Sequence, residues 1–326
     1  MAFRSIGASG FDYTTIAAAW AASSDGDILE LHDAVHTENV SVVNTSVIIQ
    51  GYTGNRSEEW NGTGATDTLR ITSTLAKQLT IRDIVFNHSV GGGDTAVRTG
   101  ISAGSKVKFM NCTIQNGAGN ACINFTAAAL DADALFLEKC RVVGNISNNY
   151  GVRDLSTLAS AVTIENCIMH AFTGSGVAIR STSSTSNVVF NILNVTMDNN
   201  NSAINISTRA NIKNVLFSSN TTDFTGTTSD ITYSATNKAS GLGSGTGVLY
   251  NLVLSDTYVN QAADDFHEKI GSVTINAGTT VASYTWDYEN TVRPQGSTYD
   301  IGAYEYVEST PSGPSNNSCM LTGAGI

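Results

Sequence analysis

Short runs of alternating apolar and polar residues recur along the middle of the chain at nearly constant spacing. The clearest of them occupy residues 79–86, 107–114, 135–142, 162–169, 190–197 and 211–217. Alternation over such lengths predicts β-strands with one buried face. Because no helical segment separates the runs and they do not pair as hairpins, the pattern is typical of a solenoid in which each coil stacks on the next.

One small apolar position marks the repeat within each run. It is filled in turn by Ile84, Cys112, Cys140, Cys167, Val195 and Val215, in steps of 28, 28, 27, 28 and 20 residues. A second set of short strands follows in the repeats, at residues 123–125, 177–179 and 204–206, between turns rich in Gly, Asn and Ser. We therefore predict an all-β fold, a right-handed parallel β-helix of about 28 residues per coil, whose inward side chains stack roughly 4.8 Å apart.

The residue before this repeated position is polar in every run. The six residues are Asp83, Asn111, Lys139, Asn166, Asn194 and Asn214. Asparagine tolerates left-handed backbone conformations and bonds to its neighbours, so the column predicts an asparagine ladder at a bend between strands. The stacked cysteines are interpreted as small buried hydrophobes, because the five cysteines of the chain show neither metal-binding nor CxxC spacing.

Both open ends of a β-helix expose unpaired strand edges and need a cap. Residues 14–22 place hydroxyl residues ahead of an alanine-rich run with Trp20, which predicts an N-terminal cap helix. The expected organisation is an N-terminal arm and cap helix (1–24), the β-helix coils (25–233), the last coils with a C-terminal cap (234–309), and a flexible or partner-docking tail (310–326).

Motifs near both ends carry a family resemblance. The segments DGDILEL at 25–31, VHTENV at 35–40 and SVIIQG at 46–51 resemble the opening coils of the pectin-lyase-like β-helix superfamily. FHEKIGS at 266–272 and RPQGSTYDIGAYE at 293–305 resemble the closing motif of bacterial and phage-encoded members. The resemblance implies the fold, but its members include lyases, hydrolases, epimerases, adhesins and virion parts, so it does not assign a function.

The composition restricts the partners. Charged residues make up 14% of the chain, with a net charge of −11 and a pI near 4.8, which disfavours nucleic acid and anionic membranes. No run of 18 apolar residues is present, and the N-terminus lacks the pattern of an export signal. Low charge suits an in-register stack, because identical charges one coil apart repel each other.

An outward column two residues before the repeated position offers candidate catalytic groups. Glu138 and Glu165 should lie one coil apart, close enough to raise the pKa of one carboxyl or to share a cation. Lys139, Arg141 and His170 are nearby candidate bases. The alternative, which we favour, is an exposed ladder of mixed charges, so no catalytic residue is assigned from the sequence.

A metal site is not indicated either. Asp131 and Asp133 offer hard oxygen ligands for Ca²⁺, but two carboxylates fall short of the six to eight ligands that this ion takes. We therefore expect no cofactor, with Ca²⁺ at this pair of residues as the alternative.

The expected function is that of a noncatalytic structural protein, namely a bacteriophage virion component that decorates the capsid or belongs to the tail. Such a protein is assembled in the host cytoplasm and displayed on the virion surface, with other virion proteins, copies of itself and surface glycans as partners. The apolar end of the tail supplies candidate docking residues, namely Cys319, Met320, Leu321 and Ile326.

Two alternatives remain open. The first is a polysaccharide lyase or glycoside hydrolase, similar to a tailspike depolymerase, that acts on the exposed β-helix face. The second is an exported, extracellular bacterial adhesin whose signal peptide is absent from the sequence.

Overall fold

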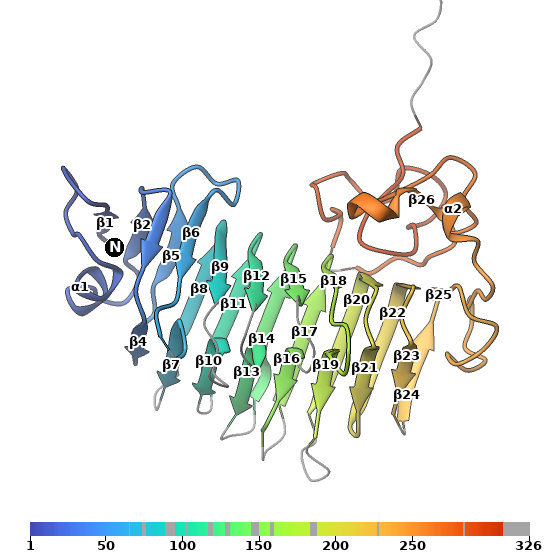
Figure 1. The fold of residues 1–326 in the computed structure, drawn as a ribbon, viewed down its shortest axis with the longest axis horizontal. Helices are drawn as coiled ribbons and strands as arrows, with labels where there is room; N and C mark the ends of the chain where they lie inside the picture. Colours follow the sequence, from blue (N-terminus) through green and yellow to red (C-terminus); the bar gives the residue numbers. More distant parts are fainter. Residues whose placement is uncertain are drawn as a thin grey trace, which may run out of the picture.

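The computed structural model describes residues 1–64, 66–73, 76–88, 95–101, 104–116, 120–127, 131–144, 150–156, 160–182, 188–226, 228–282 and 284–308. The described residues between 3 and 236 wind into a parallel β-helix whose strands lie side by side along the long axis (Figure 1). Each coil contributes strands to three faces. The prediction of an all-β parallel β-helix is confirmed.

The first face comprises β1 (Phe3–Ile6), β2 (Ile28–Leu31), β5 (Ile48–Gly51), β8 (Gln78–Arg82), β11 (Lys106–Met110), β14 (Asp131–Glu138), β17 (Ser160–Glu165), β20 (Val189–Asp198), β22 (Arg209–Ser218) and β24 (Thr228–Thr232). The second face comprises β3 (Val35–Thr37), β6 (Glu58–Asn61), β9 (Ile84–His88), β12 (Thr113–Asn116), β15 (Arg141–Gly144), β18 (Ile168–His170), the ends of β20 and β22, and β25 (Ala235–Thr236). The third face comprises β4 (Val40–Val43), β7 (Leu69–Ser73), β10 (Thr95–Ile101), β13 (Ala121–Ala127), β16 (Tyr150–Asp154), β19 (Val177–Ser181), β21 (Ser202–Ile206) and β23 (Thr222–Thr225).

The strand register follows the repeat read from the sequence. On the second face the register partners Phe86, Ile114, Val142, Met169 and Met197 lie 28, 28, 27 and 28 residues apart. All of the small apolar residues that mark the repeat, including the three cysteines, are fully buried. The core is therefore a set of stacked inward columns that no single coil would bury alone.

The bend between the first and second faces is the predicted ladder. All six of its residues adopt a left-handed backbone, with φ between 48° and 62°. Asn111 donates to Asp83 Oδ1 at 2.6 Å, and Asn214 donates to Asn194 Oδ1 at 2.8 Å. A second ladder, not predicted, joins Asn200 to Asn220 Oδ1 at 2.9 Å at the next bend.

The N-terminal end is closed by α1 (Ile16–Ala21), as predicted, with Ile16, Ala19 and Trp20 buried. Thr15 caps this helix by accepting a bond from Ala18 N at 3.1 Å. In the N-terminal arm before it, β1 pairs in parallel with β2. The apolar side chain of Ile6 is fully buried there, which explains why the segment joins the sheet.

The C-terminal segment folds back instead of forming further coils. After β25 the described residues form α2 (Leu254–Thr257), β26 (Tyr258–Asn260), the short 3₁₀ helix η1 (Gln261–Ala263) and β27 (Asp265–Glu268), and continue to residue 308. Residues 252–308, here called the fold-back segment, lie over the outside of the second face (Figure 1).

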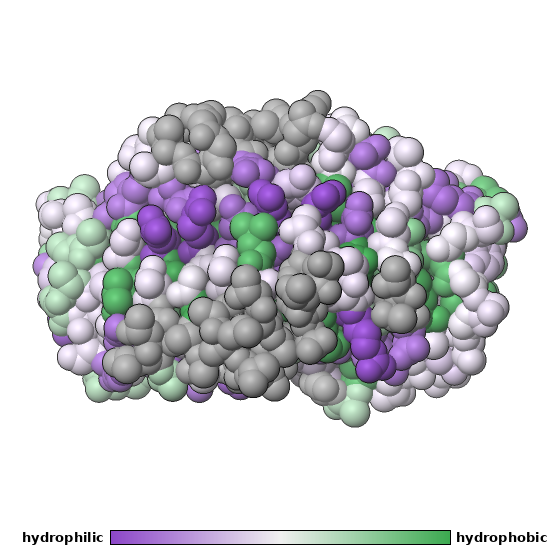
Figure 2. All heavy atoms as spheres, turned by 90° about the horizontal axis from the view of Figure 1, so that it is seen from below, coloured by the Kyte–Doolittle hydropathy of each residue, from purple (hydrophilic) through white to green (hydrophobic). Residues whose placement is uncertain are grey.

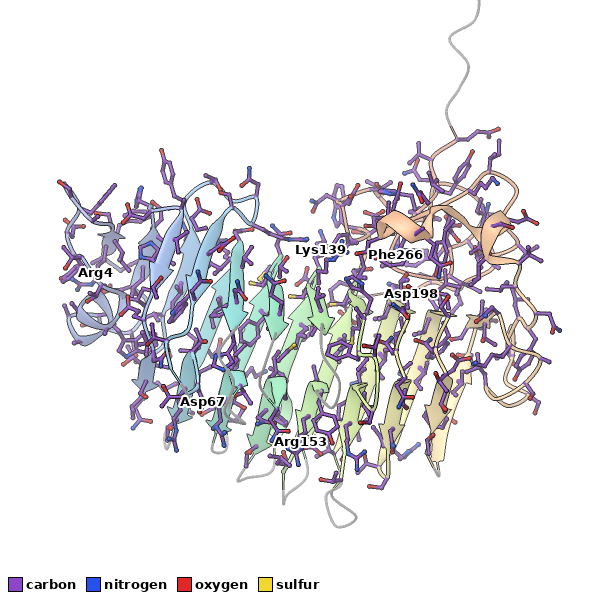
Figure 3. The ribbon with its side chains drawn as sticks, viewed as in Figure 1. Arg4, Asp67, Lys139, Arg153, Asp198 and Phe266 are labelled. Carbon is purple, nitrogen blue, oxygen red and sulfur yellow. The ribbon has the colours of Figure 1, made fainter. Side chains whose placement is uncertain are left out.

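The fold-back segment is held by a second apolar core. Leu216 of the second face packs there with Tyr258, Phe266 and Ile301 of the fold-back segment. Figure 3 shows Phe266 and Asp198 at this contact, and Lys139 beside it at the bend.

None of the helices that the structure describes combines the length and apolar composition that crossing a bilayer requires.

The strands of the third face end at the lower edge of the molecule in Figure 1, which is the side seen in Figure 2. Hydrophilic residues gather there in a band along the long axis. The outward positions of its strands are mostly polar, which leaves this face without an apolar surface of the kind that the fold-back segment covers on the second face.

Candidate functional site

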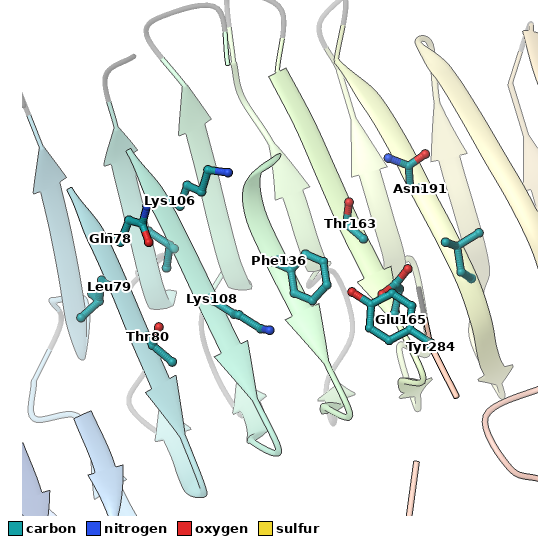
Figure 4. A pocket seen from close by; sticks show the side chains of 12 residues that line it. Gln78, Leu79, Thr80, Lys106, Lys108, Phe136, Thr163, Glu165, Asn191 and Tyr284 are labelled. Carbon is teal, nitrogen blue, oxygen red and sulfur yellow. The ribbon is translucent and has the colours of Figure 1, made fainter. Parts of the chain in front are cut away.

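The first face carries a groove of about 500 Å³ along its outer side (Figure 4). It crosses β8, β11, β14, β17 and β20, so five successive coils contribute to it. Its polar lining includes Gln78, Thr80, Lys106, Lys108, Thr163 and Asn191. These side chains share the groove because alternate residues of each strand point outward while their neighbours fill the core.

One outward column forms the centre of the groove. The register places Lys108 between Thr80 and Phe136, and continues from Phe136 to Thr163 and Asn191. The Lys108 ammonium lies 4.7 Å from the centre of the Phe136 ring and forms an ion pair with Glu138 at 2.8 Å. The column therefore combines an aromatic ring, a cation, a hydroxyl and an amide on one rigid surface.

Tyr284 of the fold-back segment completes the groove from the side. Its ring is nearly parallel to that of Phe136, at 29° and with the centroids 6.2 Å apart. The hydroxyl of Tyr299 donates to the backbone oxygen of Tyr284 at 2.7 Å, which fixes the position of the backbone there. Phe136 and Tyr284 thus form an aromatic pair built from two distant parts of the chain.

The register places Glu138 directly opposite Glu165, as predicted from their spacing. Glu165 is 2% exposed and lines the groove, whereas Glu138 is engaged by Lys108. The carboxylates are therefore neighbours at one side of the groove. Their catalytic role stays a prediction.

The structure separates the two carboxylates from the other candidates. Arg141 and His170 lie on the second face beneath the fold-back segment, where Arg141 Nε donates to His170 Nε2 at 3.0 Å. Asp264 forms an ion pair with Arg141 at 3.1 Å and lies 3.7 Å from His170 Nδ1. Phe266 packs edge-on against the imidazole at 5.7 Å. This cluster fixes the fold-back segment and does not face the groove.

This cluster makes stability depend on pH. Burial and, to a smaller extent, the Arg141 guanidinium lower the pKa of His170 to about 4, and Asp264 opposes both. Asp198, the register partner of His170, is also buried, and burial raises its pKa. The stabilisation from keeping His170 neutral is present above its unfolded pKa of 6.5 and is lost as the pH falls toward 4.

We expect His170→Gln to reduce the fall in the free energy of unfolding between pH 7 and pH 4. Wild-type protein should lose up to about 3 kcal/mol more than the variant between pH 7 and pH 4, because the unfolded chain takes up a proton that the folded imidazole refuses. Urea unfolding at a series of pH values measures the difference. Parallel profiles for the two proteins would contradict the expectation.

Lys139, another candidate base, lies at the bend rather than in the groove. Burial lowers its pKa, while Glu138 and Asp287 oppose the shift. Its ammonium donates to Asn290 Oδ1 at 2.5 Å. Its backbone oxygen accepts from Arg56, whose guanidinium also lies over the Tyr288 ring at 4.6 Å. Lys139 therefore joins the β-helix to the fold-back segment.

The remaining candidates lie outside the described parts of the chain. The side chains of Asp131 and Asp133 are not described, although their backbones begin β14, and the docking residues Cys319, Met320, Leu321 and Ile326 are not described at all. Among the described residues, no three His, Cys, Asp or Glu side chains are grouped to hold a metal ion. The expectations about Ca²⁺ and about docking stay predictions.

Sequence reasoning missed Lys108, Phe136 and Tyr284. The first two stand at equivalent positions of the 28-residue repeat, two residues ahead of the outward column that contains Glu138, so aligning that neighbouring column would have found them. Tyr284 gave no such signal, because it lies outside the repeat.

Comparison with known proteins supports the fold. No protein-family model matches the chain, and no curated protein matches it. Among solved structures, the crystal structure of pectate lyase Pel9A superposes with a TM-score of 0.54 at 12% sequence identity, covering 94% of this chain and 96% of that one. The chain therefore has a pectate-lyase-like parallel β-helix fold, in agreement with the resemblance of its terminal motifs.

Proposed function

We propose that the protein binds a segment of a glycan chain in the groove of the first face, as a rigid protein that does not cleave the chain. The aromatic pair of Phe136 and Tyr284, set among hydroxyl and amide side chains, carries the proposal. Aromatic rings pack against the C–H face of a sugar ring, while hydroxyl and amide groups bond to its hydroxyls.

The architecture suits an extended ligand. The groove crosses five strands, and its outward side chains repeat with each coil, roughly 4.8 Å apart. The backbone beneath them is fixed by parallel pairing on both sides, so little ordering is needed when a ligand binds. A polymer lying along the helix axis would meet an outward side chain of the central column on each coil.

The groove offers less to catalysis. The Lys108 ammonium holds Glu138 at 2.8 Å, whereas a glycosidase requires one of its carboxyl groups as a free proton donor. Arg141 and His170 are covered by the fold-back segment. Display on a bacteriophage virion stays a prediction, because it concerns assembly with other proteins.

We expect Phe136→Ala and Tyr284→Ala each to weaken glycan binding at least tenfold, about 1.4 kcal/mol, because each removes one ring of the aromatic pair. Screening neutral and acidic glycans on an array, followed by calorimetry with the best ligand, measures the effect. Trp286→Ala is the matched control, since Trp286 lies two residues from Tyr284, is 48% exposed and does not line the groove. Equal affinities for wild type and both groove variants would refute the assignment of the groove.

Cleavage of the bound glycan is the second candidate, favoured by the apposition of Glu138 and Glu165. Its signature is new reducing ends or unsaturated sugars after incubation with the glycan that binds. Products that disappear in Glu165→Gln would establish an enzyme in place of the binding protein. Intact glycan after long incubation would support binding alone.

A further inference from the structure

The third face carries a column of arginines on its outer side. The register runs from Arg70 to Arg98, then through Asn124 to Arg153 and Arg180. Four of the ten arginines of the chain therefore lie in one line, in a protein whose net charge is −11. Figure 3 shows Arg153 toward the lower edge of the molecule, where the strands of the third face end.

The column places like charges directly opposite each other. Arg70 faces Arg98, and Arg153 faces Arg180, one coil apart in each case. Opposed like charges on neighbouring strands are destabilising, so the stack departs from the expectation that such pairs are avoided. In the first pair, Asp67 reduces the repulsion between the two positive charges, because it accepts a hydrogen bond from Arg98 at 2.7 Å.

The second pair has different surroundings. The guanidinium groups of Arg153 and Arg180 lie over the Tyr150 ring, at 5.0 and 5.5 Å from its centre. Within the described residues neither forms an ion pair, and Arg153 Nε is buried without a hydrogen-bond partner. The nearest acidic residue in the strand, Asp154, is fully buried and accepts a bond from Ser181 instead.

We propose that Arg153 and Arg180, above Tyr150, bind a tetrahedral oxyanion, namely a sulfate or phosphate group of an anionic glycan. A guanidinium group presents several N–H donors in a planar fork. Two such forks on neighbouring strands, which lie roughly 4.8 Å apart, offer more donors than the two oxygens of one carboxylate accept, whereas the oxygens of a sulfate or phosphate group extend toward both. The bound anion removes the repulsion between the two arginines.

A glycan fits this face better than a nucleic acid. Tight, salt-sensitive nucleic-acid binding draws on many phosphate contacts, about six to ten, whereas this column offers four arginines in a chain of net charge −11. The arginine pair lies on the third face, so it is separate from the proposed groove and does not depend on it.

The test uses dextran sulfate as the probe and unsulfated dextran as its neutral counterpart. We expect the double variant Arg153→Gln/Arg180→Gln to bind dextran sulfate at least tenfold more weakly by calorimetry than wild type. Arg209→Gln is the matched control, because Arg209 is an exposed arginine on the first face, 3.9 Å from Asp230, and should change the affinity less than twofold. Urea unfolding confirms that each variant is folded.

A competition experiment with two salts defines the anion, and a groove variant serves as its control. Sodium sulfate should displace dextran sulfate more effectively than sodium chloride of equal ionic strength, and Phe136→Ala should leave this binding unchanged. Wild-type affinity in the double variant, or equal displacement by the two salts, would overturn the oxyanion site. Single-stranded DNA that binds as tightly as dextran sulfate, with the same dependence on Arg153 and Arg180, would overturn the assignment to a glycan.

Discussion

Arg293→Met is expected to lower the free energy of unfolding by about 3–5 kcal/mol, because it leaves a buried carboxylate without its cation. The Arg293 and Glu305 side chains are both fully buried and form an ion pair at 2.9 Å. Arg293 also donates to the backbone oxygens of Asp300 and Gly302, and Glu305 accepts from the backbone nitrogens of Gln295 and Asp300. One pair thus fixes the whole 293–305 loop.

The double variant Arg293→Met/Glu305→Leu is the control. Replacing both members leaves no charge buried, although the backbone groups that they bonded lose their partners. Urea unfolding should therefore show a smaller loss for the double variant than for Arg293→Met. Equal losses would mean that the loop depends on the backbone bonds of Arg293 rather than on the ion pair.

The same loop connects stability to function. Tyr299 lies within it and bonds to the backbone of Tyr284, which completes the groove. A fold-back segment that loosens in Arg293→Met would displace Tyr284, so glycan affinity should fall along with stability. The closing motif therefore matters for the proposed site although it does not line it.

The repeat made the β-helix predictable from the sequence. Inward residues such as Phe109 and Leu137 recur at a fixed step, and a shift by one residue would turn the whole strand inside out, so the register had one acceptable solution. The bend was predictable for a related reason, since a left-handed backbone favours asparagine, which fills four of the six bend positions.

The rest of the molecule was harder to predict because it lies outside the repeat. The fold-back segment packs on the second face through Phe266 and Ile301, which have no periodic partners in the sequence. The candidate bases Arg141 and His170 are covered by that segment, so their distance from the groove could not be read from spacing. Groove residues on the coils themselves, such as Phe136, could be found from the repeat, whereas Tyr284 could not.

Asn214→Gly is expected to lower the free energy of unfolding by about 3 kcal/mol. This is much more than the backbone conformation at residue 214 alone implies. The residue has φ of 55°, which glycine adopts without strain, so the backbone requirement is met. Its side chain, however, donates to Asn194 Oδ1 and to the backbone oxygen of Thr279, and accepts from Thr279 N at 2.9 Å. Losing it leaves several buried polar groups unpaired, at about 1–3 kcal/mol each.

Asn166→Gly separates the two roles of the ladder. Asn166 occupies the equivalent bend two coils earlier, with φ of 48° and no exposure, and its amide has no hydrogen-bond partner among the described residues. We expect this variant to lose less than about 1 kcal/mol, since glycine keeps the bend and no bond is broken. Urea unfolding compares the two variants directly. Equally small losses in both variants would mean that the asparagines act only through their backbone conformation. A large loss confined to Asn214→Gly would show that Asn214, the last asparagine of the ladder, anchors the fold-back segment.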